Sequence, residues 1–127
     1  YQDPSSGTWY QVTDQGAREG NYLESSATAL FIYTLAKAIN KGYIGNEYIE
    51  PTQKAFDGMV KTFTRLEEDG SYTITNCCAV AGLGGDSKRY RDGSFEYYIS
   101  EPIIENDPKS VGSFILAAIE YEKMTKK

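Results

Sequence analysis

The most apolar stretch of the chain lies between residues 27 and 39, where only two threonines and one lysine are polar. Asn21 followed by Glu24 has the pattern of a helix cap with its capping-box partner, and Gly42 is a typical stop after Asn40. We therefore predict a helix from Asn21 to about Asn40. A helix that is apolar around its circumference must be covered on more than one side.

A second helix is predicted from Pro51, a favourable first-turn residue, to about Leu66. Charged residues occupy the rest of its helical wheel, so it is amphipathic and lies on the outside. Its apolar positions are Ala55, Phe56, Met59, Val60, Phe63 and Leu66.

A third helix is predicted from Asp107 and Pro108 to about Lys123, and its middle is again apolar on every side. Along the chain, the first and third helices are therefore expected to lie inside and the second outside. Successive helices with short connections run antiparallel, so the first and third are parallel to each other. The loops that precede them, 7–21 and 67–107, should then meet at one end of the molecule.

The longer loop has its own local pattern. Residues 71–75 and 95–99 have the composition of strands, and Asp92 with Gly93 is a good tight-turn pair. We expect a short β-hairpin within this loop. The fold class is therefore all-α with a hairpin, in a single segment that spans residues 1–127.

Two almost wholly apolar helices cannot be shielded by one amphipathic partner, and soluble monomers avoid large exposed apolar patches. The pattern indicates a piece of a larger layered helical structure, such as inner helices surrounded by outer ones. The alternative is a chain that oligomerises through these faces.

The composition of the chain excludes several classes of function. The net charge of -5 argues against nucleic-acid binding, and no apolar run reaches the ~20 residues that cross a bilayer. The absence of histidine excludes Ser/His and Cys/His nucleophilic sites within this chain. Cys77 and Cys78 are adjacent, so we expect two small buried thiols in a loop, without a mutual disulfide. We expect no metal and no cofactor.

Several blocks in order resemble the C-terminal portion of glycoside hydrolase family 105, the unsaturated rhamnogalacturonyl hydrolases, which are close to the unsaturated glucuronyl hydrolases of family 88. The blocks are GTWYQV (7–12), REGNYLESS (18–26), AVAGLGG (79–85), YRDGSFEYY (90–98), SEP (100–102) and NDPK (106–109), followed by Gly112.

The resemblance implies an (α/α)6 barrel of which the three helices would be the last three. It implies removal of a 4,5-unsaturated uronic acid from a pectin fragment, in which an aspartic acid protonates the vinyl ether while water adds. The family's catalytic aspartate belongs to a part of the enzyme absent here. We therefore expect no catalytic residue in this chain, an inactive fragment, and a partner in the N-terminal part of the same enzyme.

Aromatic and polar loop residues are the candidates for substrate binding, because tyrosine and tryptophan offer a flat apolar face to a sugar ring. Trp9 either stacks on a sugar or anchors its loop, and Arg91 either binds a substrate carboxylate or forms a salt bridge with Asp92 or Glu96. The full set of candidates is Trp9, Tyr10, Gln11, Tyr90, Arg91 and Tyr97. Tyr98, on the opposite face of the expected strand, is assigned to the core.

For several other polar residues and glycines, a structural role is the preferred interpretation. Glu24 and Asp107 are explained by capping. Asp14, Glu19 and Glu101 are freer, but no chemistry is assigned to them. The glycine-rich run at residues 82–85 lacks the Lys-Ser/Thr of a phosphate loop and indicates backbone with positive φ.

The functional alternative is a non-catalytic carbohydrate-binding or interaction module. A third possibility is a clipped product that accompanies its other half. The expected partners are an oligosaccharide and the N-terminal part, with neither nucleic acid nor membrane, in a bacterial cytoplasm or periplasm.

Overall fold

The computed structural model describes residues 1–16, 18–86 and 90–126. Three long helices form its body: α1 (Ser25–Lys41), α2 (Ile49–Phe63) and α4 (Pro108–Thr125). The shorter elements are η1 (Thr13–Gln15), η2 (Asn46–Tyr48), β1 (Thr64–Leu66), β2 (Tyr72–Ile74), β3 (Cys77–Cys78), α3 (Phe95–Ser100) and β4 (Ile103–Ile104).

Helix α1 begins at Ser25, three residues later than the capping-box pattern predicts, because a cap at Asn21 would start the helix at residue 22. Glu24 is itself the N-cap, and its carboxylate accepts the backbone N–H of Ala27. Asn21 is occupied within its loop, because its Oδ1 accepts from Val12 N and its Nδ2 donates to Val12 O. Gly42 ends the helix in the left-handed conformation, as predicted.

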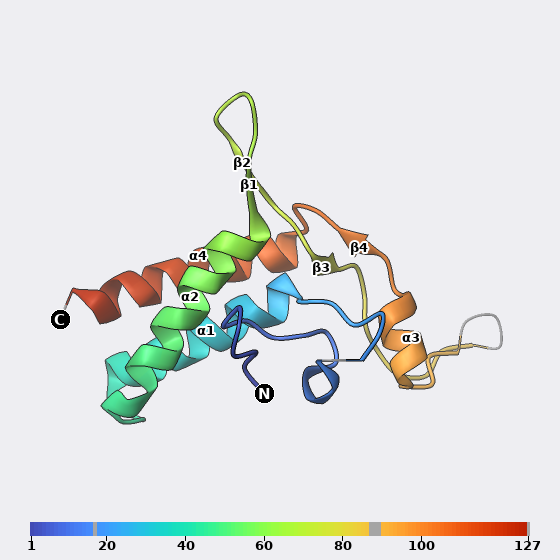
Figure 1. The fold of residues 1–127 in the computed structure, drawn as a ribbon, viewed down its shortest axis with the longest axis horizontal. Coiled ribbons are helices and arrows are strands. Elements are labelled where there is room, and N and C mark those ends of the chain that lie inside the picture. Colours follow the sequence, from blue (N-terminus) through green and yellow to red (C-terminus); the bar gives the residue numbers. More distant parts are fainter. Residues whose placement is uncertain (17, 87–89, 127) are drawn as a thin grey trace.

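Helix α2 ends at Phe63, three residues before the predicted end. The chain becomes extended at Thr64 because β1 pairs with β2 in an antiparallel hairpin that projects from the body (Figure 1). Arg65 joins the base of this hairpin to Glu105 through two hydrogen bonds of 2.7 and 2.9 Å. Leu66 is thus a strand residue that is 62% exposed.

The predicted strand at residues 95–99 is wrong, since these residues form α3. The Ser94 hydroxyl accepts the N–H of Tyr97 and starts a helical turn, which overrides the β-propensity of the aromatic residues. The expected placement of Tyr98 in the core also fails, because Tyr98 is half-buried. The hairpin lies instead at the junction between the predicted second helix and the long loop, in β1 and β2.

Helices α1 and α4 run side by side in the same direction (Figure 1), as predicted. Near their C-terminal ends Asn40 Nδ2 donates to the carbonyl of Glu120 at 2.8 Å. Helix α2 runs the opposite way and is tied to α4 by stacking of Phe56 on Tyr121, with ring centroids 3.9 Å apart. The core between the helices is Ala29, Ile32, Ala55, Met59, Phe63 and Ala117.

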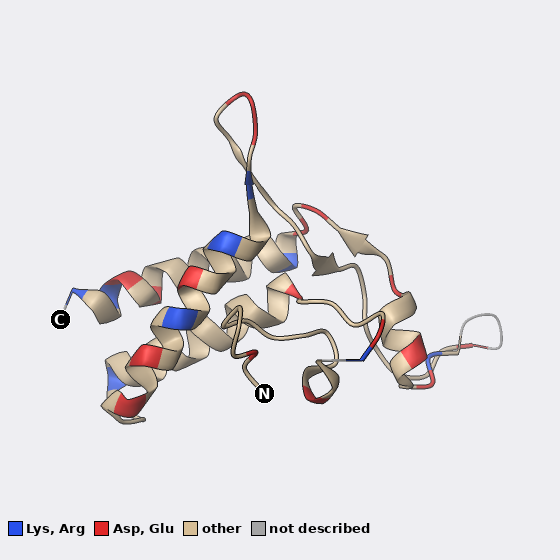
Figure 2. Cartoon of the chain, in the orientation of Figure 1, with Lys and Arg blue, Asp and Glu red and all other residues tan. Residues whose placement is uncertain are grey.

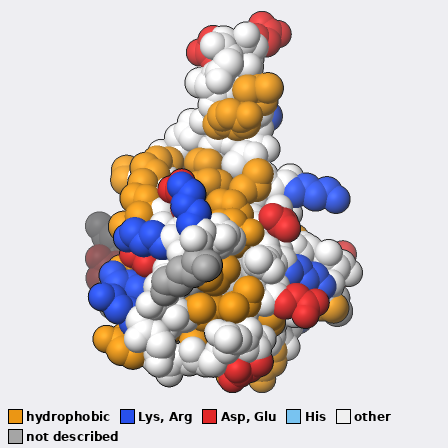
Figure 3. All heavy atoms as spheres, turned by 90° about the vertical axis from the view of Figure 1, so that its left-hand side faces the viewer, with side chains coloured by type: hydrophobic (Ala, Val, Ile, Leu, Met, Phe, Trp, Pro, Cys, Tyr) orange, Lys and Arg blue, Asp and Glu red, His pale blue; other side chains and the backbone are white. Residues whose placement is uncertain are grey.

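The distribution of charge agrees with the inner and outer assignment. Acidic and basic residues alternate along α2, whereas the middle parts of α1 and α4 carry few charges (Figure 2). Hydrophobic side chains spread between basic ones over the end of the molecule where α4 terminates, and also lie on the hairpin stem (Figure 3). Large side chains left exposed on α1 and α4 are Leu30, Phe31, Ile115, Leu116 and Ile119.

Candidate functional site

The two loops in front of α1 and α4 meet, as predicted. Gln11 Nε2 donates to Cys78 Sγ at 3.2 Å. Arg18 bridges to α3, where its guanidinium pairs with Glu96 and lies 3.8 Å from the ring centroid of Phe95. The loops and the beginning of α1 therefore form one continuous end of the molecule.

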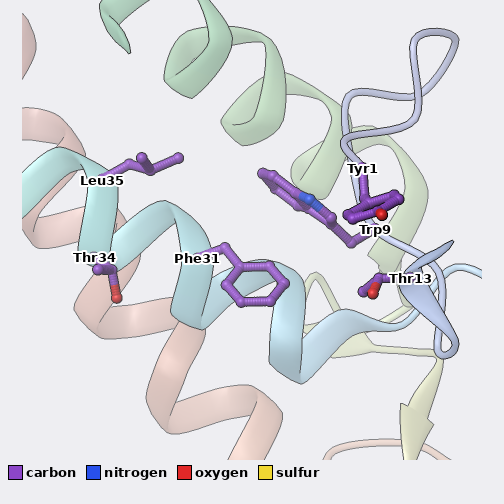
Figure 4. A pocket seen from close by; sticks show the side chains of 6 residues that line it. All are labelled: Tyr1, Trp9, Thr13, Phe31, Thr34 and Leu35. Carbon is purple, nitrogen blue, oxygen red and sulfur yellow. The ribbon is translucent and has the colours of Figure 1, made fainter.

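Trp9 lies against α1. Its ring makes an edge contact with Phe31 at a centroid distance of 5.0 Å, and the backbone N–H of Trp9 donates to Thr28 Oγ1 at 3.1 Å. Beside it is an open hollow of about 310 Å³ whose lining is largely apolar (Figure 4). The lining residues are Tyr1, Trp9, Thr13, Phe31, Thr34 and Leu35.

The two neighbours of Trp9 are tied into the loop. Tyr10 pairs with Leu23 in an isolated antiparallel bridge. Its ring lies against Gly16, where an added Cβ would come within 2.9 Å of the ring. Gln11 directs its amide to Cys78, so that amide joins the two loops.

The other three candidates form a second group around Gly82. Arg91 exchanges two backbone hydrogen bonds with Gly84, at 2.8 and 2.9 Å. The Tyr97 hydroxyl accepts the N–H of Gly82 at 3.2 Å, while Tyr90 is 69% exposed. Among the described residues, Trp9 contacts α1, whereas Arg91 and Tyr97 contact the second loop at Gly84 and Gly82.

Burial raises the pKa of the Tyr97 hydroxyl, and a hydrogen bond to Glu101 raises that pKa further. The sequence interpretation of Glu101 as a freer carboxylate is wrong, because its side chain is buried and 2% exposed. The sequence carried no signal of this burial, since residues 95–99 were predicted to form a strand. Arg18 was also missed, since a single arginine in a loop has no distinctive pattern.

The acids named as salt-bridge partners of Arg91 are engaged elsewhere. Asp92 accepts the N–H of Ser94 at 2.9 Å, and Glu96 pairs with Arg18. Capping by Glu24 and Asp107 is confirmed at the starts of α1 and α4.

The remaining sequence interpretations concern glycine and cysteine. Gly84 and Gly85 have φ of +75° and +127°, as expected for a run that needs positive φ. Cys77 and Cys78 are buried free thiols, in strand β3 rather than in a loop. Lys88 and Arg89, which come shortly before Arg91 in the sequence, lie outside the described residues.

The family model of Glycosyl Hydrolase Family 88 matches residues 1–125. The chain belongs to this family. Two curated relatives are each 37% identical over 119 residues: Protein Atu3128 of Agrobacterium fabrum and the 24.9 kDa protein in the picA locus of Rhizobium radiobacter. The matched region is 91% of this chain and 51% of either relative, so the chain spans about half the length of both.

Solved structures give the same assignment and connect it to family 105. The family 105 glycoside hydrolase of C. acetobutylicum is 46% identical with a TM-score of 0.91, and covers 95% of this chain and 33% of its own. A possible family 105 member from Klebsiella pneumoniae is 29% identical with a TM-score of 0.71, over 98% of this chain and 28% of its own. Family 105 enzymes have an α/α barrel fold, which confirms the resemblance and the fold class expected from the sequence.

Among the described residues there is no cluster of three or more acidic or cysteine side chains arranged to hold a metal ion. Within the same residues, no helix combines the length and the apolarity needed to span a bilayer.

Proposed function

We propose that this chain is the C-terminal part of a glycoside hydrolase that removes 4,5-unsaturated uronic acid from rhamnogalacturonan oligosaccharides by hydration of the vinyl ether. The supporting observation is the meeting of two aromatic loops at the starts of two parallel inner helices, in a chain of family 88. In such a site this chain contributes part of the rim, and an aspartic acid from another segment donates the proton.

In this proposal Arg91 binds the carboxylate of the substrate, because a guanidinium pairs with a carboxylate through two parallel hydrogen bonds. Tyr90 is exposed and provides a ring face beside it. The hollow next to Trp9 accepts either a sugar ring or an apolar side chain from a neighbouring segment.

The missing segment is the N-terminal part of the same enzyme. The chain corresponds to a third of the C. acetobutylicum structure, and its inner helices leave an apolar face uncovered. Helices from the remaining two thirds of a barrel would bury that face. Burial of apolar surface contributes about 25 cal/mol per Å², so the covered barrel is expected to be far more stable than the chain alone.

Reconstitution tests the proposal. This chain and the separately expressed N-terminal part are assayed alone and together on unsaturated rhamnogalacturonan disaccharide, by the loss of the ultraviolet absorbance of its conjugated double bond. We expect activity only in the mixture. Failure of every reconstitution, or full activity of this chain alone, contradicts the proposal.

The alternative of a carbohydrate-binding module is favoured by the hollow beside Trp9. Trp9 is the single tryptophan of the chain, so its fluorescence reports on that hollow alone. Saturable quenching of the isolated chain by oligosaccharide, with no activity in any mixture, would support the module.

A further inference from the structure

We propose that Arg18 is a positioning residue of the rim, because its guanidinium fixes α3 against the loop in front of α1 and thereby sets the place of the Arg91 guanidinium. This inference rests on the proposed function for the role of Arg91 in binding the carboxylate of the substrate. The contacts that connect Arg18 to α3, and α3 to the surroundings of Arg91, are independent of that function.

Helix α3 needs contacts with other segments to keep its place. It has only six residues, and a helix of this length is not stable in water by itself. The Arg18 guanidinium lies 3.8 Å from the ring centroid of Phe95 and pairs with Glu96. Its Nη1 also donates to Gln15 Oε1 at 2.8 Å, within its own loop. One planar group therefore joins the loop to the helix by stacking and by directed hydrogen bonds, a combination that lysine does not provide.

The backbone of the same loop contacts α3 at a second place. A Cβ added to Gly20 would lie 2.8 Å from Ile99 Cδ1, and the φ of +85° at Gly20 favours glycine. Arg18 thus contacts the start of α3, and Gly20 lies against its end. Two contacts at opposite ends fix the direction of the helix as well as its position.

Helix α3 in turn holds the segment against which Arg91 lies. The Tyr97 hydroxyl accepts the Gly82 N–H at 3.2 Å. A Cβ added to Gly82 would lie 3.2 Å from Arg91 Nη1, so the guanidinium lies against the open side of this glycine. Gly84 and Arg91 exchange two backbone hydrogen bonds, which fix the base of the same side chain. A shift of α3 therefore moves the surface that the Arg91 guanidinium contacts.

Arg18 also compensates the charge of Glu96, whose side chain is 69% exposed. An unpaired carboxylate at the rim would repel an anionic uronate. Loss of Arg18 alone would thus weaken binding of the substrate both by charge and by displacement of α3. Replacing Arg18 and Glu96 together by neutral residues leaves the net charge unchanged, so that displacement alone remains.

The test uses the full-length enzyme that contains this chain, with Arg18→Met alone and together with Glu96→Gln. Arg65→Met is the matched control, because Arg65 is similarly exposed and pairs with Glu105 beside the hairpin instead of at α3. We expect both Arg18 variants to raise KM for the unsaturated uronate about fivefold with kcat nearly unchanged, the effect of losing an exposed ion pair and a cation–π contact. Arg65→Met should keep the wild-type KM. A double variant that returns to the wild-type KM has lost only a charge effect, and this result overturns the proposal.

The methyl ester of the same substrate separates positioning from general damage, since it lacks the charge that Arg91 recognises. We expect its KM to stay near the wild-type value in both Arg18 variants. An equal rise of KM for acid and ester overturns the proposal.

Hydrogen exchange tests the contacts without activity. Residues 79–86 and 95–100 should exchange faster in both Arg18 variants than in the wild type and Arg65→Met, because α3 loosens together with the acceptor of the Gly82 N–H. Unchanged exchange overturns the proposal. Faster exchange in an enzyme that does not act on the uronate disproves the proposed function and leaves the positioning of α3 by Arg18 standing.

Discussion

Glu24 connects the start of α1 to the second loop through one buried carboxylate. Its Oε2 accepts the N–H of Ala27 at 2.7 Å, and its Oε1 accepts the N–H of Cys78 at 3.0 Å. Ser26 donates its hydroxyl to the same group at 2.9 Å. With 1% of its surface exposed, Glu24 satisfies amides that water does not reach.

Replacing Glu24 with alanine should therefore destabilise the fold by about 3 kcal/mol, the sum of a lost cap and an orphaned buried amide. Urea unfolding, monitored by circular dichroism, measures this loss in the free energy of unfolding. Glu24→Gln, which keeps an acceptor, should lose less, and Glu19→Ala at an exposed loop position should change little. A loss for Glu24→Ala no larger than that of Glu19→Ala would disprove the connecting role.

At the scale of elements, the N-terminal segment crosses α2 with its backbone almost in contact. A Cβ at Gly58 would lie 1.8 Å from the carbonyl oxygen of Ser6, and Gly7 has a positive φ beside Lys54. Gln2 Nε2 donates to the carbonyls of Gly7 and Pro51 and holds the crossing. Glycine within α2 is thus required by the close approach.

Alanine normally stabilises a helix by about 1 kcal/mol relative to glycine. At Gly58 we expect the opposite sign, a loss of more than about 1 kcal/mol, because the N-terminal segment must be displaced. Gly112 in α4 is the matched control, since an added Cβ there meets nothing within 4 Å, and Gly112→Ala should stabilise. Thermal unfolding distinguishes the two signs, and stabilisation by both changes would refute the crossing.

At the scale of the whole molecule, the exposed apolar residues of α1 and α4 form the largest departure from an ordinary soluble domain. Ile115 is 54% exposed, Leu30 48% and Ile119 44%, although each lies within a long helix. A face of this kind indicates an interaction surface.

The isolated chain should therefore self-associate with rising concentration, as measured by sedimentation velocity. Introducing lysine at Ile115 and Ile119 together should shift it to monomer and abolish reconstitution with the N-terminal part. Tyr43→Lys, at a loop residue that is 79% exposed, should change neither property. A wild-type chain that stays monomeric at every concentration would disprove the interpretation of this face.

The sequence by itself determined the three long helices and their inner, outer, inner order. These depend on local signals, namely apolar periodicity, the proline and aspartate at the start of α4, and Gly42 at the end of α1. Such signals act between residues that are close in the chain. They can therefore be recognised without knowing which distant segments pack against the helix. The convergence of the two loops followed from the parallel direction of α1 and α4.

Only the tertiary structure decided the details of the rim. Asn21 cannot cap α1 because residues 12 and 15 occupy its side chain, and α2 stops at Phe63 because Thr64 pairs with Ile74. Glu101, interpreted from the sequence as a freer carboxylate, is only 2% exposed in the fold. Local propensities differ by about 1 kcal/mol or less per residue, so hydrogen bonds and burial contributed by distant segments outweigh them.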